Sequence, residues 1–123
     1  MNSVIDSRYT YKVKSVEKVV DGDTVDLIID LGFNITVKER IRLSGINTPE
    51  LRSGTIESKN LAQAAAVKLA DLLQRGDVYI KTERDKTEKY GRYLGYLIVY
   101  VTEFGSELNV NKILLDEGFA VKF

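Results

Sequence analysis

The residues best able to do chemistry in this 123-residue chain are carboxylates and arginines, because the sequence contains no cysteine and no histidine. Disulfides, thiolate metal sites and imidazole bases are therefore excluded. Any hydrolytic reaction must use carboxylates, arginines, hydroxyl groups or a hard metal ion. The composition thus narrows the possible chemistry before any motif is considered.

One candidate metal-binding motif is Asp21-Gly22-Asp23-Thr24, which places two carboxylates around a glycine at a predicted turn. Like charges this close repel each other unless a cation lies between them. Asp-Gly pairs are also among the commonest turn sequences, so the motif alone favours a structural turn.

A second motif places Arg42 five residues before Asn47-Thr48-Pro49-Glu50. An arginine on a strand can bind a phosphate through two parallel N–H donors. Pro49, the chain's only proline, fixes the backbone between Thr48 and Glu50. Taken alone, Glu50 is better explained as a solvated acid in a surface loop.

A third motif, Lys89-Tyr90-Gly91-Arg92, joins two cations and an aromatic ring. Such a group can contact a phosphate together with a base or a sugar. In isolation, a polar hairpin loop is the better interpretation of these four residues.

The overall charge gives little support to a nucleic-acid partner, because 18 basic residues balance 18 acidic ones. A dedicated nucleic-acid binder usually carries a basic excess. Locally, however, acids gather in residues 21–30 and cations in residues 81–92. This separation suits a metal ion beside an anionic substrate, although a solvated charged face gives the same pattern.

The elements that must position these residues are five strands and two helices. A chain of 123 residues has room for one domain. The predicted ranges are strands over 9–16, 24–30, 35–46, 77–81 and 93–102, and helices over 57–75 and 109–117, before an extended end over 119–123. This order fits an α+β protein built on an OB-type barrel, with an open α+β sheet as the alternative.

The longer predicted helix carries an apolar stripe that should face the barrel. Ser53 or Thr55 can cap its start, and Gly76 should end it. The stripe contains Leu61, Ala62, Ala65, Ala66, Leu69, Leu72 and Leu73.

The order and spacing of the motifs are more specific than any single motif. Asp-Gly-Asp-Thr, Arg-x-x-x-x-Asn-Thr-Pro-Glu, an Ala-rich helix, Asp-x-x-x-Lys-Tyr-Gly-Arg and Asn-x-x-Leu-x-x-x-Gly-x-Ala follow one another. This series resembles the staphylococcal (micrococcal) nuclease family, also called thermonucleases. The resemblance predicts a flexible N-terminus over 1–8 and a nuclease-like domain over 9–123.

The resemblance implies a five-stranded OB-fold barrel with packed helices and one Ca²⁺ beside the scissile phosphate. It assigns Asp23 as a metal ligand, Asp21 as a supporting acid and the backbone carbonyl of Thr48 as a further ligand. It also places Asn47 at a position where the family usually has a second ligating aspartate. An asparagine there removes one negative charge, so we expect weaker Ca²⁺ binding.

The resemblance also implies the catalytic roles. Arg42 and Arg92 contact the phosphate, and Glu50 orients or deprotonates the attacking water. Lys89 and Tyr90 bind a terminal phosphate of the nucleotide. The implied reaction is Ca²⁺-dependent hydrolysis of single-stranded or denatured DNA and RNA, which leaves 3′-phosphate and 5′-hydroxyl ends.

The chain ends at Phe123, where members of the family continue with pocket tyrosines and a further helix, so we expect the domain to be C-terminally short and to lack that helix. The alternative function is a non-catalytic, nuclease-like module that binds nucleic acid or protein. We expect a monomer with no membrane association, since no apolar run is long enough to span a bilayer. No signal peptide is visible, which predicts a cytoplasmic protein, or a secreted one if a signal has been removed.

Overall fold

The computed structural model describes residues 8–87 and 91–123 of the chain. Its elements follow the sequence in the order β1 (Thr10–Asp21), β2 (Thr24–Asp30), β3 (Thr36–Leu43), β4 (Ile46–Asn47), α2 (Ile56–Leu73), β5 (Asp77–Thr87), β6 (Tyr93–Val101), β7 (Ser106–Asn109), α3 (Val110–Asp116) and β8 (Val121–Lys122).

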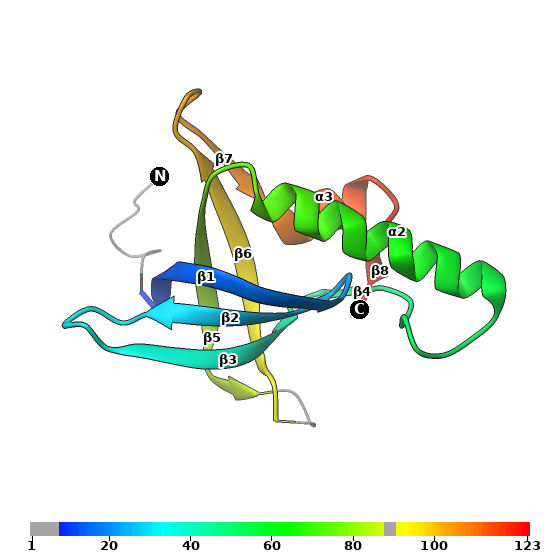
Figure 1. Cartoon of the computed structure of the whole chain (residues 1–123), viewed down its shortest axis with the longest axis horizontal. Helices are drawn as coiled ribbons and strands as arrows, with labels where there is room; N and C mark the ends of the chain where they lie inside the picture. The colour runs from blue at the N-terminus through cyan, green and yellow to red at the C-terminus, as the bar shows by residue number, and fades with distance from the viewer. Residues whose placement is uncertain (1–7, 88–90) are drawn as a thin grey trace.

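Five strands close into a barrel, as predicted for an OB-like α+β protein (Figure 1). The main sheet has the order β3-β2-β1-β5-β6-β7, and β3 also pairs in parallel with β6. That last pairing joins the two ends of the five-stranded ring and excludes the alternative of an open sheet. Strand β7 extends the sheet beside β6, while β4 and β8 form a separate short ladder.

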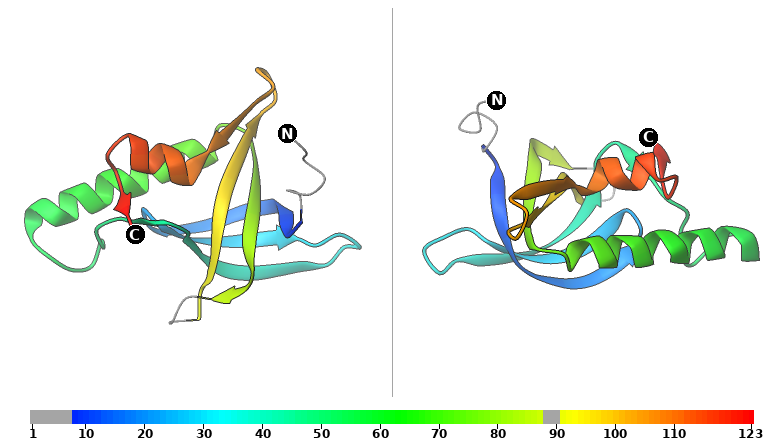
Figure 2. Two further views of the ribbon diagram at one scale, coloured as in Figure 1. Left: turned by 180° about the vertical axis from the view of Figure 1, so that it is seen from behind. Right: turned by 90° about the horizontal axis from the view of Figure 1, so that it is seen from above.

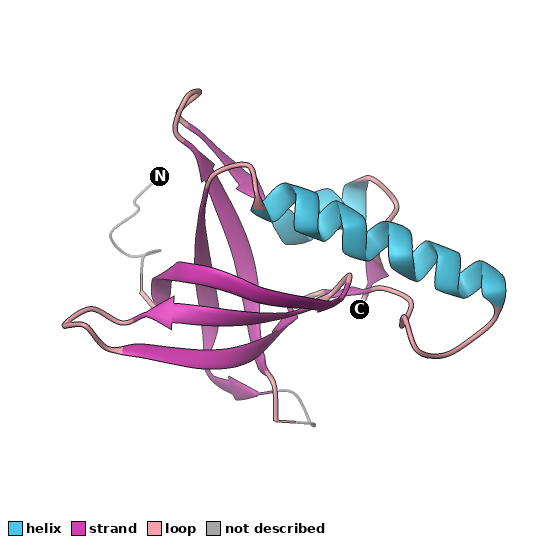
Figure 3. Cartoon of the chain, viewed as in Figure 1, coloured by secondary structure: helices cyan, strands magenta, loops and turns pink. Residues whose placement is uncertain are grey.

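The core lies inside this barrel, between the inward faces of its strands and the two helices. The predicted inward residues of β2, Val25, Leu27 and Ile29, are all buried. Both helices pack to the same side of the barrel, as Figures 2 and 3 show. An ion pair of 2.9 Å between Lys68 Nζ and Glu117 Oε1 links α2 to the end of α3.

Helix α2 begins at Ile56 because the side chain of Thr55 caps it, accepting a hydrogen bond from the Ser58 backbone N–H. Of the predicted stripe, Ala62, Ala65, Leu69, Leu72 and Leu73 are buried. The prediction was wrong for Leu61, which is 57% exposed. The first turns of α2 extend past the barrel, so the helix has fewer packing partners there (Figure 1).

The predicted strand over 35–46 is interrupted, because a turn at Ser44 and Gly45 separates β3 from β4. Gly45 has a φ of +79°, a left-handed conformation that favours glycine. The turn brings the carbonyl of Ile46 back toward Arg42, which the uninterrupted strand would not have done.

Two further differences concern polar segments whose pairing the apolar pattern did not reveal. Strand β5 continues to Thr87, beyond the predicted end at residue 81, and the polar strand β7 was not predicted. Both are held by backbone pairing with β6. Among the described residues, no helix is long and apolar enough to cross a membrane.

Candidate functional site

A cleft of about 870 Å³ lies where the β1–β2 turn, the β3–β4 turn and the loop after β4 meet. Seven of the predicted site residues line it. They are Asp21, Asp23, Arg42, Asn47, Thr48, Glu50 and Arg92. The other two, Lys89 and Tyr90, lie outside the described residues. Motifs 70 residues apart in the sequence are thus brought to one place by the barrel.

The β1–β2 turn is pressed against helix α2 at Gly22. A Cβ atom at this position would lie 2.5 Å from the Cβ of Ala65, far closer than two carbon atoms can approach. Glycine is therefore required here by close packing, in addition to its preference for turns. This contact fixes the turn that carries Asp21 and Asp23.

Asp23 is buried and accepts hydrogen bonds from two sides. The backbone N–H of Thr48 donates to Oδ2 at 2.9 Å, and the Thr24 hydroxyl donates to Oδ1 at 2.9 Å. These bonds tie the β1–β2 turn to the loop after β4. They hold the carboxylate in one orientation.

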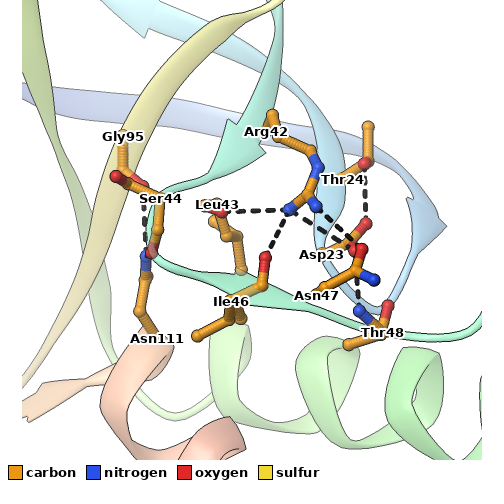
Figure 4. A network of polar contacts seen from close by, with 10 residues as sticks. All are labelled: Asp23, Thr24, Arg42, Leu43, Ser44, Ile46, Asn47, Thr48, Gly95 and Asn111. Atoms are coloured by element: carbon orange, nitrogen blue, oxygen red, sulfur yellow. Dashed lines mark hydrogen bonds and ion pairs between the residues drawn. The ribbon is translucent and has the colours of Figure 1, made fainter. Parts of the chain in front are cut away.

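Arg42 is also buried, and most of its donors are directed to uncharged oxygen atoms (Figure 4). Nη1 donates to the carbonyls of Leu43 at 3.1 Å and Ile46 at 2.8 Å, while Nη2 donates to Asn47 Oδ1 at 2.9 Å. Its ion pair with Asp23 is longer, at 3.4 Å. The guanidinium is thus held in a fixed position by neutral groups, with one acid close by.

Three other predicted site residues, Asp21, Glu50 and Arg92, also lie in the cleft. Asp21 accepts a hydrogen bond of 3.0 Å from the backbone N–H of Leu51. Glu50 is exposed and accepts a longer bond of 3.3 Å from the Ser53 hydroxyl. Arg92, at the start of β6, is half-buried in the cleft wall. A carboxylate that faces solvent in a cleft with two arginines can contact a water molecule beside an anion that the arginines hold.

Asn111 is a buried residue of α3 that the sequence motifs included but to which no role was assigned. Its side-chain amide donates to the carbonyls of Ser44 at 2.9 Å and Gly95 at 3.1 Å (Figure 4). It also accepts a hydrogen bond of 3.1 Å from the Leu97 backbone N–H. Asn111 therefore fixes the β3–β4 turn against β6, and so supports the backbone to which Arg42 is bonded.

Three further cleft residues were missed by the sequence analysis. The hydroxyl of Ser44 donates to Glu83 Oε1 at 2.6 Å, and both residues line the cleft. The ring of Phe123 lies 5.3 Å from Cζ of Arg42. No local pattern signals either contact, because each joins segments that are distant in the sequence.

A neighbouring pair lies outside the cleft, with Asp26 on β2 and Arg40 on β3. Arg40 Nε and Nη2 donate to the two carboxylate oxygens of Asp26 at 2.7 and 3.0 Å. These hydrogen bonds from Arg40 are the main reason that the pKa of Asp26 lies below its ordinary value of 3.8. In return, the pKa of Arg40 is raised by the same carboxylate.

The oxygen atoms of the cleft are of the kind that hard metal ions prefer, but their charge is low. Among the side chains that the structure describes, in residues 8–83 and 91–123, no group of three acidic, histidine or cysteine side chains is gathered for a metal. The predicted ligands in the cleft are the carboxylates of Asp21 and Asp23, the amide oxygen of Asn47 and the backbone of Thr48. This donor set is compatible with Ca²⁺ at modest affinity.

The comparisons with known proteins agree with this arrangement. Residues 40–123 match the family model described as staphylococcal nuclease homologue. The chain is 34% identical over 105 residues to a thermonuclease of Staphylococcus intermedius, with 85% of this chain and 56% of the relative covered. It is 32% identical over 109 residues to protein ParB of Escherichia coli, with 85% and 54% covered. An uncharacterized protein of Methanocaldococcus jannaschii is 30% identical over 136 residues, with 96% and 62% covered. The chain thus spans little more than half the length of these relatives.

Proposed function

We propose that this chain, which belongs to the staphylococcal nuclease homologue family, is a calcium-dependent phosphodiesterase that cleaves nucleic acid. The observation that carries the proposal is the gathering of two arginines and four acids in one cleft. The substrates are single-stranded or denatured DNA and RNA. The products carry 3′-phosphate and 5′-hydroxyl ends, as the family assignment suggests.

The arginines provide the charge that the reaction needs. Hydrolysis of a phosphodiester builds negative charge on the phosphoryl oxygens, and donors fixed in advance stabilise that charge best. Arg42 is fixed by two backbone carbonyls and by Asn47. In the proposed reaction Arg42 and Arg92 contact the phosphate and hold it for in-line attack.

Glu50 is the proposed partner of the attacking water. In a chain without histidine, a carboxylate is the available base near neutral pH. Glu50 is exposed at the cleft and only loosely bonded to Ser53, so it can accept a proton from a water molecule between itself and the phosphate.

Ca²⁺ would be held by Asp21, Asp23 and Thr48, with Asn47 offering its amide oxygen. When bound, the ion supplies further stabilisation of phosphoryl charge. Asn47 Oδ1 already accepts a hydrogen bond from Arg42, and Asp23 lies 3.4 Å from the same guanidinium. Both contacts compete with a cation, which supports weak rather than tight Ca²⁺ binding.

The same two contacts favour the second candidate, a module that binds nucleic acid without cutting it. If Arg42 and Asn47 remain paired when nucleic acid binds, the phosphate is held but no metal is recruited. Binding would then be independent of Ca²⁺. The presence of Glu50 in the same cleft as two arginines supports the enzyme, because binding alone does not need a carboxylate there.

The proposal is tested by incubating end-labelled denatured DNA and RNA with the protein in Ca²⁺ or in EGTA. We expect fragments only with Ca²⁺, and we expect phosphatase treatment to alter their 3′ ends. The control is Glu107→Gln, which changes an exposed acid on β7 and should cleave as the wild type does. Retained binding of the oligonucleotide without cleavage in either condition would favour the binding module.

A further inference from the structure

A second hollow, of about 380 Å³, opens at the rim of the barrel and shares only Glu83 with the lining of the nuclease-like cleft. The β2–β3 hairpin, which points away from the helices in Figure 1, forms part of its rim. Three tyrosines line it together with aliphatic residues and two acids. Its lining residues include Tyr9, Tyr11, Tyr93, Ile29, Glu39 and Glu83.

Strand alternation directs these side chains into the barrel, because residues two apart on a strand face the same side. Tyr11 is two residues before the buried Val13, and Tyr93 is two residues before the buried Gly95. Glu39 likewise precedes the buried Ile41. The hollow is therefore the open end of the barrel interior, where the apolar core gives way to tyrosines.

Glu39 is the unusual member of this group. It is half-buried on the inner face of β3 and pairs across the sheet with Leu27, which is fully buried. Within the described part of the chain, no hydrogen bond or ion pair reaches its carboxylate. A partly buried charge without a partner is costly, and a cation in the hollow would offset that cost.

The charge of the lining indicates which class of ligand the hollow can bind. Both ionisable acids, Glu39 and Glu83, are negative, and no lysine or arginine is present among the described lining residues. A nucleic-acid phosphate would be repelled there. Glu83 already accepts a hydrogen bond from the Ser44 hydroxyl at 2.6 Å. Glu39 is therefore the carboxylate that we expect to contact a ligand.

We propose that this hollow binds an alkylated ammonium group. Aromatic faces attract a cation through their quadrupole, and alkyl groups suit an apolar pocket better than the hydration shell of a bare ammonium does. Tyr9, Tyr11 and Tyr93 supply the rings, and Glu39 supplies the counter-charge. The group can belong to a free quaternary amine or to a methylated lysine in a peptide.

The test is NMR titration of the full chain with choline and, in parallel, with its uncharged isostere 3,3-dimethylbutanol. We expect choline to shift resonances of Tyr9, Tyr11 and Tyr93, and to bind about tenfold more tightly than the isostere. A peptide with trimethyl-lysine, compared with its unmodified form, distinguishes the two sources of the group.

Two variants and one control complete the test. Glu39→Gln keeps the shape of the side chain and should weaken choline binding about tenfold, and Tyr93→Leu should weaken choline but not the isostere. Glu107→Gln, an exposed acid on β7, should change neither. Circular dichroism verifies that each variant is folded. Equal binding of choline and the isostere, or wild-type binding by folded Glu39→Gln, would overturn the proposal, as would shifts confined to the nuclease-like cleft.

Discussion

Two arginines on strand β3 lie two residues apart, on the same side of the sheet, and have different environments. Arg40 pairs across the sheet with Asp26, and Arg42 with Thr24. The side chain of Arg40 is 49% exposed and meets one carboxylate through two short bonds. The side chain of Arg42 is 11% exposed and meets mainly carbonyl and amide oxygens.

Under the proposed function, neighbouring positions on one strand serve structure and function separately. The charge of Arg40 is matched by Asp26, so little of it remains for another anion. Arg42 is positioned by neutral acceptors, which fix its geometry without cancelling its charge. A fixed and incompletely neutralised guanidinium is what a phosphate site requires.

The largest expected effect comes from removing each arginine in turn. Arg42→Ala should raise the barrier to hydrolysis by about 3–4 kcal/mol, the usual cost of losing one fixed charge donor. Arg40→Ala should leave the rate within about twofold, because surface ion pairs contribute little. Initial rates on denatured DNA at saturating Ca²⁺ measure both. An equal loss of rate in the two variants would contradict the claim that the different environments of Arg40 and Arg42 give them different roles.

The next effect extends the comparison to two carboxylates. Asp26 accepts hydrogen bonds from Nε and Nη2 of Arg40, whereas Glu50 accepts only a long bond from Ser53 among its described contacts. Glu50→Gln should lower the rate about a hundredfold or more, as expected for a lost general base. Asp26→Asn is the matched control. Calcium titration by calorimetry should show little change in either variant, and parallel loss of rate and Ca²⁺ binding would make Glu50 a metal ligand instead.

Asn47→Asp sharpens the comparison by placing an acid beside Arg42. We expect Ca²⁺ to bind more tightly by about 1–3 kcal/mol, or roughly ten- to a hundredfold, because a divalent cation gains a further charged ligand. Cleavage should rise most at limiting Ca²⁺. Repulsion from Asp21 and Asp23 should slightly destabilise the metal-free protein, although the contact with Arg42 offsets part of it. Unchanged Ca²⁺ affinity would place this position outside the metal site.

The smallest expected effect is on acid stability. Arg40 lowers the pKa of Asp26 in the folded state, so the pair stabilises the protein fully above the ordinary value of 3.8. That contribution is lost as the pH falls through the lowered pKa. Arg40→Gln should therefore cost less than about 1 kcal/mol at neutral pH, because the arginine is half exposed. Thermal unfolding at pH 7 and near pH 3 should show the difference between the two proteins shrinking in acid, and a difference that grows in acid would contradict this sign.

Much of the barrel could be predicted because apolar periodicity determines which residues face inward. Val25, Leu27 and Ile29 follow the alternation of a strand, and Leu69 and Leu72 follow the period of a helix. The predicted strand ran through the break at Gly45, although the step from Leu43 to Ile46 departs from the alternation of a strand. Leu61 is exposed because it lies where α2 extends beyond its packing partners.

The candidate site was predicted from motif order, and its supporting contacts were not. Seven named residues line the cleft because turns and strand ends carry the motifs to one side of the barrel. The bonds of Asn111 to the β3–β4 turn and the ring of Phe123 over Arg42 depend on how α3 and β8 pack. Such contacts arise from tertiary structure and leave no local signal in the sequence.

The most direct test of the contrast between the two arginines observes both in one sample. The Nε–H resonances of Arg40 and Arg42 would be followed by NMR while a phosphorothioate oligonucleotide that resists hydrolysis is added in the presence of Ca²⁺. We expect the Arg42 resonance to shift in proportion to bound oligonucleotide while that of Arg40 stays in place. A shift of Arg40 alone, or no shift of Arg42 at saturation, would contradict the proposal that Arg42 binds the phosphate.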